Sequence, residues 1–217
     1  MAGRASTSTP GARSPIGCLK SQPGVDADRI GLWGTSYAGG HALVLGATDR
    51  RLKGVVAQVP TISGYQQSLR PVAPDQVPAL EGSFSDDDRR VFAGEAPATQ
   101  LVVSADPATL AAYDSPDAVA FYTQPLPEGV HYQNRVPVRS SRAARMYEPG
   151  QWVSRVSPTP LLMIFGLNDT ITDTGLAAYE RALQPKKLVT ITGGHFHPYL
   201  DQFEKSTKSV GSARLRA

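Results

Sequence analysis

The sequence contains a single cysteine and no long apolar run. An intramolecular disulfide needs two cysteines, so Cys18 alone excludes one. No cysteine and histidine residues stand at the spacings that structural zinc sites use, and we therefore expect neither a metal site nor a cofactor. No stretch approaches the ~20 apolar residues that a membrane-spanning helix needs, so the sequence predicts no membrane association.

The sequence also lacks a strong charge of either sign. It has 22 Lys and Arg against 19 Asp and Glu, and its net charge is +3. The basic residues near the C-terminus are interpreted as a solvated tail rather than a nucleic-acid patch, because no aromatic residues alternate with them. The segment Met1–Gly17 has no apolar core of the kind a secretory signal needs. We expect a cytoplasmic enzyme with no nucleic-acid partner.

The composition changes along the chain and predicts its organisation. Residues 1–24 are rich in Gly, Pro, Ser and Thr, and we expect them to be disordered. Residues 25–217 are predicted to form one domain. Within it, prolines punctuate residues 61–158, which predicts an insertion of short helices that caps the domain.

Short apolar segments alternate with helical patterns outside this insertion. Strands are predicted at 29–34, 52–60, 158–166 and 186–194, and helices at 36–47, 172–183 and 198–210. The strand at 52–60 is continuously apolar rather than alternating, as parallel strands covered on both faces tend to be. The fold class predicted is α/β, a parallel sheet with helices on both faces.

These patterns also assign several side chains to structural roles. Trp33 is expected in the core, and Leu176, Tyr179 and Leu183 are expected to form the buried stripe of their helix. In the insertion, Ser85 is predicted to cap a helix whose first turn holds the acidic residues 86–88. A cation site is the alternative for those three carboxylates.

Three predicted strands are each followed by a residue that can take part in nucleophilic catalysis. Ser36 follows the first strand, Asp169 the third and His195 the fourth. The carboxyl ends of parallel strands share one edge of the sheet, so we expect these residues to converge. A serine hydroxyl becomes a good nucleophile when a histidine takes its proton and a carboxylate orients that histidine.

The segments "RIGLWGTSYAGG", "PTPLLMIFGLNDTIT" and "KKLVTITGGHFHPYLDQFE" resemble the α/β-hydrolase superfamily. Within it they are similar to dienelactone-hydrolase-like enzymes and fungal polyketide-transferase-like hydrolases. The resemblance covers residues 24–66 and 147–205. It implies a nucleophile at Ser36, an acid at Asp169 and a base at His195. The backbone N–H of Tyr37, the residue after the nucleophile, would stabilise the oxyanion.

Each assignment has an alternative. The stretch "GTSYA" has Ala38 where the G-x-S-x-G consensus has glycine, so Ser36 could instead be a hydroxyl in a glycine-rich bend. Asp173 and Asn168 compete with Asp169 for the role of acid, although Asp173 is better explained as a helix cap. His197 competes with His195 for the role of base. Two further histidines are given other roles: His41 is expected to pack and His131 to be exposed.

The resemblance also implies further strands before the one that leads to Ser36, but Ser36 has only 35 predecessors here, and most of them show no matching pattern. We therefore expect the C-terminal half of the fold, with the strand before Ser36 as an apolar edge through which the chain could self-associate. The function predicted is a serine hydrolase that acts on a small-molecule ester, thioester or lactone and is impaired by truncation. The alternatives are an acyl or polyketide transferase of secondary metabolism and an inactive hydrolase remnant.

Overall fold

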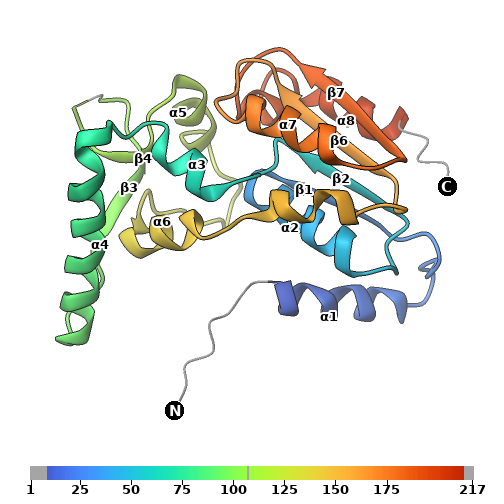
Figure 1. Ribbon diagram of the computed structural model, residues 1–217, viewed down its shortest axis with the longest axis horizontal. Coiled ribbons are helices and arrows are strands. Elements are labelled where there is room, and N and C mark those ends of the chain that lie inside the picture. The colour runs from blue at the N-terminus through green and yellow to red at the C-terminus, as the bar shows by residue number, and fades with distance from the viewer. Residues whose placement is uncertain (1–8, 107, 213–217) are drawn as a thin grey trace.

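The computed structural model describes residues 9–106 and 108–212 and contains a four-stranded parallel sheet (Figure 1). The strands pair in the order β1-β2-β6-β7, and every pair is parallel. Their bounds are Gly31–Thr35 for β1, Gly54–Gln58 for β2, Leu161–Gly166 for β6 and Lys186–Ile191 for β7. All four lie within the segments predicted as strands, except that β1 runs one residue further.

Helices cover both faces of this sheet. One face packs against α2 (Ser36–Thr48), the 3-10 helix η2 (Pro149–Arg155) and α7 (Thr172–Arg181), and the other against α8 (Phe203–Ser212). Alternate residues of the central strands divide between two cores, with Leu161 and Met163 facing α2 while Leu162 and Ile164 lie in the core that includes Val210 of α8. This two-sided burial explains the continuously apolar strands. The predicted fold class is confirmed.

The N-terminal segment differs from its prediction. Residues 9–20 form helix α1 (Thr9–Lys20), which lies along α2 (Figure 1), so the expected disorder of residues 1–24 is wrong there. The side chain of Ile16 is buried in the main core. Composition could not predict this helix, because it depends on one apolar residue reaching a core built by distant segments. Residues 1–8 lie outside the described residues.

The insertion forms a second lobe beside the sheet (Figure 1). It contains α3 (Gly64–Leu69), η1 (Pro74–Gln76), α4 (Val77–Phe92), α5 (Pro116–Tyr122) and α6 (Val138–Arg145). It also contains a small sheet that the sequence did not predict, with strand order β4-β3-β5. Those strands span Thr99–Val103 for β3, Ala111–Tyr113 for β4 and Val136–Pro137 for β5.

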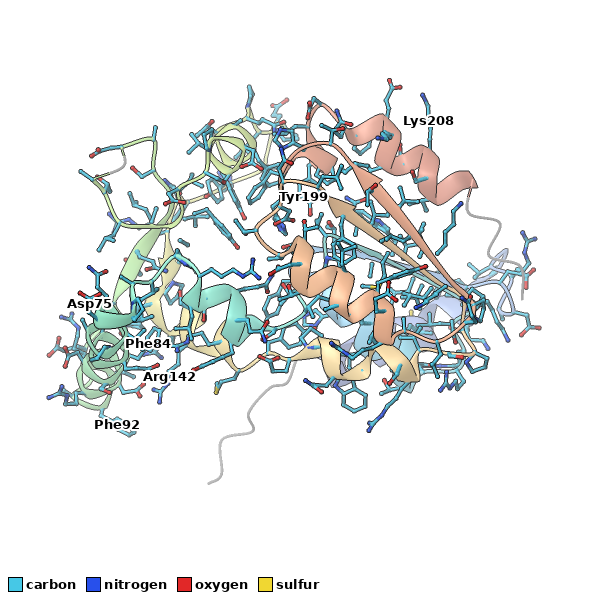
Figure 2. All side chains as sticks on the ribbon, turned by 45° about the horizontal axis from the view of Figure 1, so that its top comes forward. Asp75, Phe84, Phe92, Arg142, Tyr199 and Lys208 are labelled. Carbon is cyan, nitrogen blue, oxygen red and sulfur yellow. The ribbon has the colours of Figure 1, made fainter. Side chains whose placement is uncertain are left out.

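The acidic residues of α4 form ion pairs rather than a helix cap. Ser85 lies inside α4, where its hydroxyl donates to the carbonyl of Glu81, so the predicted cap is wrong. The three carboxylates pair with arginines: Asp86 with Arg89, Asp87 with Arg139, and Asp88 with Arg142. Two of these pairs join α4 to α6, and Phe84 is buried between the same helices (Figure 2). The pairs account for the triplet without a cation.

Two further packing predictions are wrong. Trp33 is 53% exposed on β1, and Leu183 is 57% exposed near the end of α7. The buried face of α7 carries the small residues Gly175 and Ala178, because this helix lies directly against the ring of Phe165 in β6. Because α7 lies so close to β6, only small side chains fit between them, and the larger Leu176 faces outward.

We expect Gly175→Ala to destabilise the protein. A β-carbon at this position would overlap the ring of Phe165, so α7 must shift, at a cost of about 1–3 kcal/mol. The matched control is Gly82→Ala in α4, where no atom lies within 4 Å of the added carbon. There alanine should stabilise the helix by about 0.5–1 kcal/mol. Urea unfolding of both variants measures the two effects, and equal stabilities would contradict this packing.

The buried carboxylate of Asp87 should make stability depend on acid pH. The N–H of Ala98 and the guanidinium of Arg139 hold the pKa of Asp87 below its usual range. Because the folded pKa lies below the unfolded one, this stabilisation is present above pH ~4 and is lost as the pH falls through the folded pKa. Asp87→Asn should lower the Tm at neutral pH and flatten its fall in acid. Asp86→Asn, at an exposed pair, should leave both nearly unchanged.

Strand β1 pairs with β2 and with no other strand of the described residues. Self-association along this edge stays a prediction.

Across the same described part of the chain, no helix combines the length and the apolar character that spanning a bilayer requires.

Candidate active site

The three strand-end residues lie together at the carboxyl edge of the main sheet. Ser36 begins α2 directly after β1, Asp169 lies in the loop after β6, and His195 lies in the loop after β7. His195 Nε2 is 2.8 Å from Ser36 Oγ, and His195 Nδ1 is 2.8 Å from Asp169 Oδ2. His195 thus joins Asp169, 26 positions away, and Ser36, 159 positions away, in one continuous chain of hydrogen bonds.

The backbone at Ser36 adopts a strained, left-handed conformation. Its φ of +53° lies in the left-handed region, which residues other than glycine rarely adopt. A β-carbon on Gly34 would collide with the carbonyl of Ala38, and one on Gly39 would lie 2.9 Å from Pro60. The turn therefore needs glycine on both sides of Ser36, and it accepts alanine at position 38. This geometry favours the strand-to-helix turn over a bend that merely contains a hydroxyl.

The carboxylate of Asp169 is fixed on both oxygens. Its side chain has no exposed area, its Oδ1 accepts the N–H of Ile171 at 3.1 Å, and its Oδ2 faces His195. With Asp169 Oδ2 accepting from Nδ1–H, the lone pair of His195 Nε2 is directed at the hydroxyl of Ser36. The arrangement can therefore accept the serine proton and stabilise the imidazolium that forms.

The competing residues lie elsewhere. Asp173 is in the first turn of α7, is 70% exposed and pairs with Arg70 at 2.6 Å; the cap position belongs to Ile171, so the predicted cap is wrong. Asn168 is exposed. His197 Nδ1 accepts the N–H of Gly194 at 2.9 Å. None of these three residues has a recorded contact with Ser36, and each catalytic role stays a prediction.

No group of three His, Cys, Asp or Glu side chains among the described residues could hold a metal ion.

Both a protein-family model and solved structures match this chain. The family model for X-Pro dipeptidyl-peptidase (S15 family) matches residues 14–197. The chain belongs to this family. The crystal structure of the α/β hydrolase GrgF from Penicillium sp. sh18 covers 94% of the chain with a TM-score of 0.70 at 22% identity, and the chain covers 68% of it. The crystal structure of the hypothetical protein PA2218 from Pseudomonas aeruginosa covers 96% of the chain with a TM-score of 0.74 at 21% identity, and the chain covers 67% of it.

Curated relatives extend the similarity of this S15-family chain. The quorum-quenching protein AidA of Acinetobacter baumannii is 27% identical over 195 residues, which are 89% of the chain and 63% of AidA. The polyketide transferase grgF of Penicillium sp. is 26% identical over 184 residues, which are 82% of the chain and 58% of that protein. The chain thus spans about three fifths of the length of these relatives. The resemblance to the α/β-hydrolase superfamily and to polyketide-transferase-like hydrolases is confirmed.

Tyr37, the residue after Ser36, lies in an aromatic cluster with Tyr147 and His41 in this S15-family fold. The half-exposed ring of Tyr37 stacks on Tyr147 with centroids 4.4 Å apart, and Tyr147 Oη lies 2.6 Å from His41 Nδ1. Burial raises the pKa of Tyr147 and lowers that of His41, so both are neutral near pH 7. His41 packs as predicted, and His131 is exposed.

A second tyrosine contacts the residue before the nucleophile. The hydroxyl of Tyr199, in η3 (His197–Tyr199), hydrogen-bonds the side chain of Thr35. Figure 2 shows Tyr199 where the main sheet meets the insertion, and burial raises its pKa to about 12. No role was predicted from the sequence for Tyr147 or Tyr199. Their partners lie 106 and 164 residues away, so no local pattern could have revealed them.

Proposed function

We propose that this chain is a serine hydrolase that cleaves a small-molecule ester, thioester or lactone. One observation carries the proposal: the unbroken hydrogen bonds from Ser36 through His195 to the buried carboxylate of Asp169. This is the arrangement that turns a serine hydroxyl into a nucleophile near neutral pH. The strained φ of Ser36 gives independent support, because such strain collects at sites where a side chain must be presented.

The reaction follows from these positions. Ser36 Oγ attacks the substrate carbonyl carbon while His195 Nε2 takes the serine proton. The tetrahedral intermediate collapses, His195 returns the proton to the leaving oxygen or sulfur, and an acyl-serine remains. His195 Nε2 then takes a proton from water, which attacks the acyl carbon, and His195 returns that proton to Ser36 Oγ as the acid leaves. Asp169 keeps neutral His195 protonated on Nδ1 and stabilises the imidazolium that forms in each step.

Tyr37 supplies an oxyanion contact in this proposal. It is the second residue of α2, and the first N–H groups of a helix have no partner within the helix. Its N–H can therefore donate to the oxygen of the tetrahedral intermediate. Loss of one oxyanion donor lowers kcat about 10²- to 10³-fold. The reduced rate that the sequence analysis expects from truncation stays a prediction.

Labelling with a fluorophosphonate probe tests the proposal. The probe should form one adduct, and peptide mapping by mass spectrometry should locate it on Ser36. Hydrolysis is measured in parallel with a p-nitrophenyl ester, an acyl thioester and a lactone, and with an Xaa-Pro amide because the family description names that peptidase activity. A folded protein that takes no label and cleaves none of these substrates would refute the proposal.

Acyl transfer is the second candidate, and the similarity to a polyketide transferase favours it. The acyl-serine would be the same, but an alcohol would replace water in the second step. Adding an alcohol acceptor to the ester assay separates the two reactions. A new ester formed at the expense of the free acid indicates transfer, whereas an unchanged yield of acid indicates hydrolysis.

A further inference from the structure

The loop that carries His195 is attached to the insertion through one carboxylate. Asp117, in the first turn of α5, accepts the backbone N–H of Phe196 on its Oδ2 at 3.0 Å. Its Oδ1 accepts the N–H of Ala118 at 3.1 Å, within its own helix. Figure 1 shows α5 beside the loops that follow β6 and β7. Asp117 therefore links the insertion to the residue immediately after His195.

The backbone is held on the other side of His195 as well. The N–H of Gly194 donates to His197 Nδ1 at 2.9 Å, and that nitrogen lies 3.5 Å from Asp117 Oδ2. Side chains thus bind the N–H groups of both neighbours of His195. A hydrogen bond from Phe196 N–H to a charged carboxylate is stronger than one to a neutral oxygen, so Asp117 makes the firmer of the two attachments.

The side chain of Phe196 anchors the same loop. It is 5% exposed and belongs to the apolar cluster of the insertion, with Val103 and Ala118. Its ring lies 5.3 Å from that of Phe121 and 5.6 Å from that of Tyr122. The residue after His195 is therefore buried in the core of the insertion rather than in the core of the main sheet.

The glycines before His195 permit this contact. A β-carbon on Gly194 would lie 2.9 Å from Asp117 Oδ2, and one on Gly193 would overlap the ring of His197. Gly193 also has a φ of +100°, which glycine adopts without strain. The double glycine thus does more than end β7, because it lets the carboxylate of Asp117 reach the loop.

We infer that Asp117 is a positioning residue, through which the insertion holds His195 in line with Ser36 and Asp169. The inference rests on the proposed function. The hydrogen bonds of His195 are 2.8 Å long on both sides, so a small displacement of its loop changes the length or angle of both. A misplacement of ~1 Å in a catalytic group can lower the rate about 100-fold. The insertion is then part of the catalytic assembly as well as a cover.

Two substitutions at Asp117 test how strongly its carboxylate affects kcat. Asp117→Ala removes both acceptor oxygens and should lower kcat about 10- to 100-fold, with KM within about threefold. Asp117→Asn keeps the shape and one acceptor, so its kcat should lie between those of the wild type and the alanine variant. The control is Asp106→Asn, whose carboxylate caps a turn of its own loop in the insertion. This control should keep kcat within about twofold.

A measurement without turnover separates this inference from the proposed function. The proton shared by His195 Nδ1 and Asp169 should give a downfield resonance in the wild type, assigned by its absence in His195→Gln. We expect this resonance to shift or broaden in both Asp117 variants and to be unchanged in Asp106→Asn. Melting curves set the assay temperature below the transition of every variant.

If the wild type is active, kcat decides, and an Asp117→Ala variant with kcat within twofold, or with a change in KM alone, overturns the positioning role. If the wild type neither takes the probe nor cleaves any substrate, the proposed function fails and the resonance decides. An unchanged resonance in both Asp117 variants then overturns the positioning role, and a shifted one supports it.

Discussion

Ser36→Ala should lower kcat for ester hydrolysis by about 10⁴- to 10⁶-fold and abolish labelling by the fluorophosphonate probe. In the proposed mechanism Ser36 supplies the atom that bonds to the substrate carbonyl, and among the described residues no other hydroxyl hydrogen-bonds His195 Nε2. KM should change little, since the hydroxyl contributes to the transition state rather than to substrate binding. Steady-state kinetics and labelling of the purified variant measure both effects.

The stability of the same variants provides a check on folding. Alanine keeps the strained φ of +53°, so Ser36→Ala should unfold at nearly the wild-type temperature. Ser36→Gly relieves that strain and should raise the free energy of unfolding by about 1 kcal/mol or more, although it is equally inactive. The control Ser83→Ala changes an exposed serine of α4 and should keep full activity. A loss of activity in Ser83→Ala, or retained labelling in Ser36→Ala, would contradict the assignment of Ser36.

The sequence predicted the main sheet because its strands carry their own signal. The central strands β2 and β6 are buried along their whole length and are mostly apolar, and all four strands alternate with helices long enough to be distinguished from them. The same alternation located Ser36, Asp169 and His195, since each directly follows a strand whose end the pattern marks. Topology then brings the three side chains to one edge, and this step needs no knowledge of the insertion.

Features that depend on contacts between distant segments could not be predicted in this way. The exposure of Trp33 follows from which neighbours cover the face of β1, and the small buried face of α7 follows from how closely that helix approaches Phe165. Helix α1 depends in the same way on the core that receives Ile16. Periodicity reports which side of an element is apolar, but not how near its neighbour lies.

Asp117 shows a further limit of sequence reasoning. Its partner is a backbone N–H 79 residues away, and a backbone group is the same at every position of the chain. No motif can therefore mark the contact. The surrounding segment "DSPDAV" is typical of a helix start, which explains the acidic residue without any role for it.

Asp169→Asn should lower kcat by about 10⁴-fold, whereas Asp173→Asn should lower it less than about threefold. Asp169 accepts the N–H of Ile171 on one oxygen and faces His195 on the other, and asparagine offers a single acceptor for these two places. When that acceptor keeps Ile171, the amide NH₂ faces His195 Nδ1, which must then be the unprotonated nitrogen. The proton moves to Nε2 and points at Ser36, so His195 can no longer accept the serine proton.

Asp173 is the matched control for this substitution, because it lies four residues away in the same loop-to-helix connection. Its carboxylate is exposed and pairs with Arg70, and exposed pairs contribute at most about 1 kcal/mol to stability. Kinetics of both variants, with melting curves to establish that each is folded, separate the two residues. If Asp173→Asn loses the activity and Asp169→Asn keeps it within tenfold, the acid of the site is misassigned. The opposite result ties catalysis to the carboxylate that is buried and doubly bound, rather than to the acidic residue nearest the start of a helix.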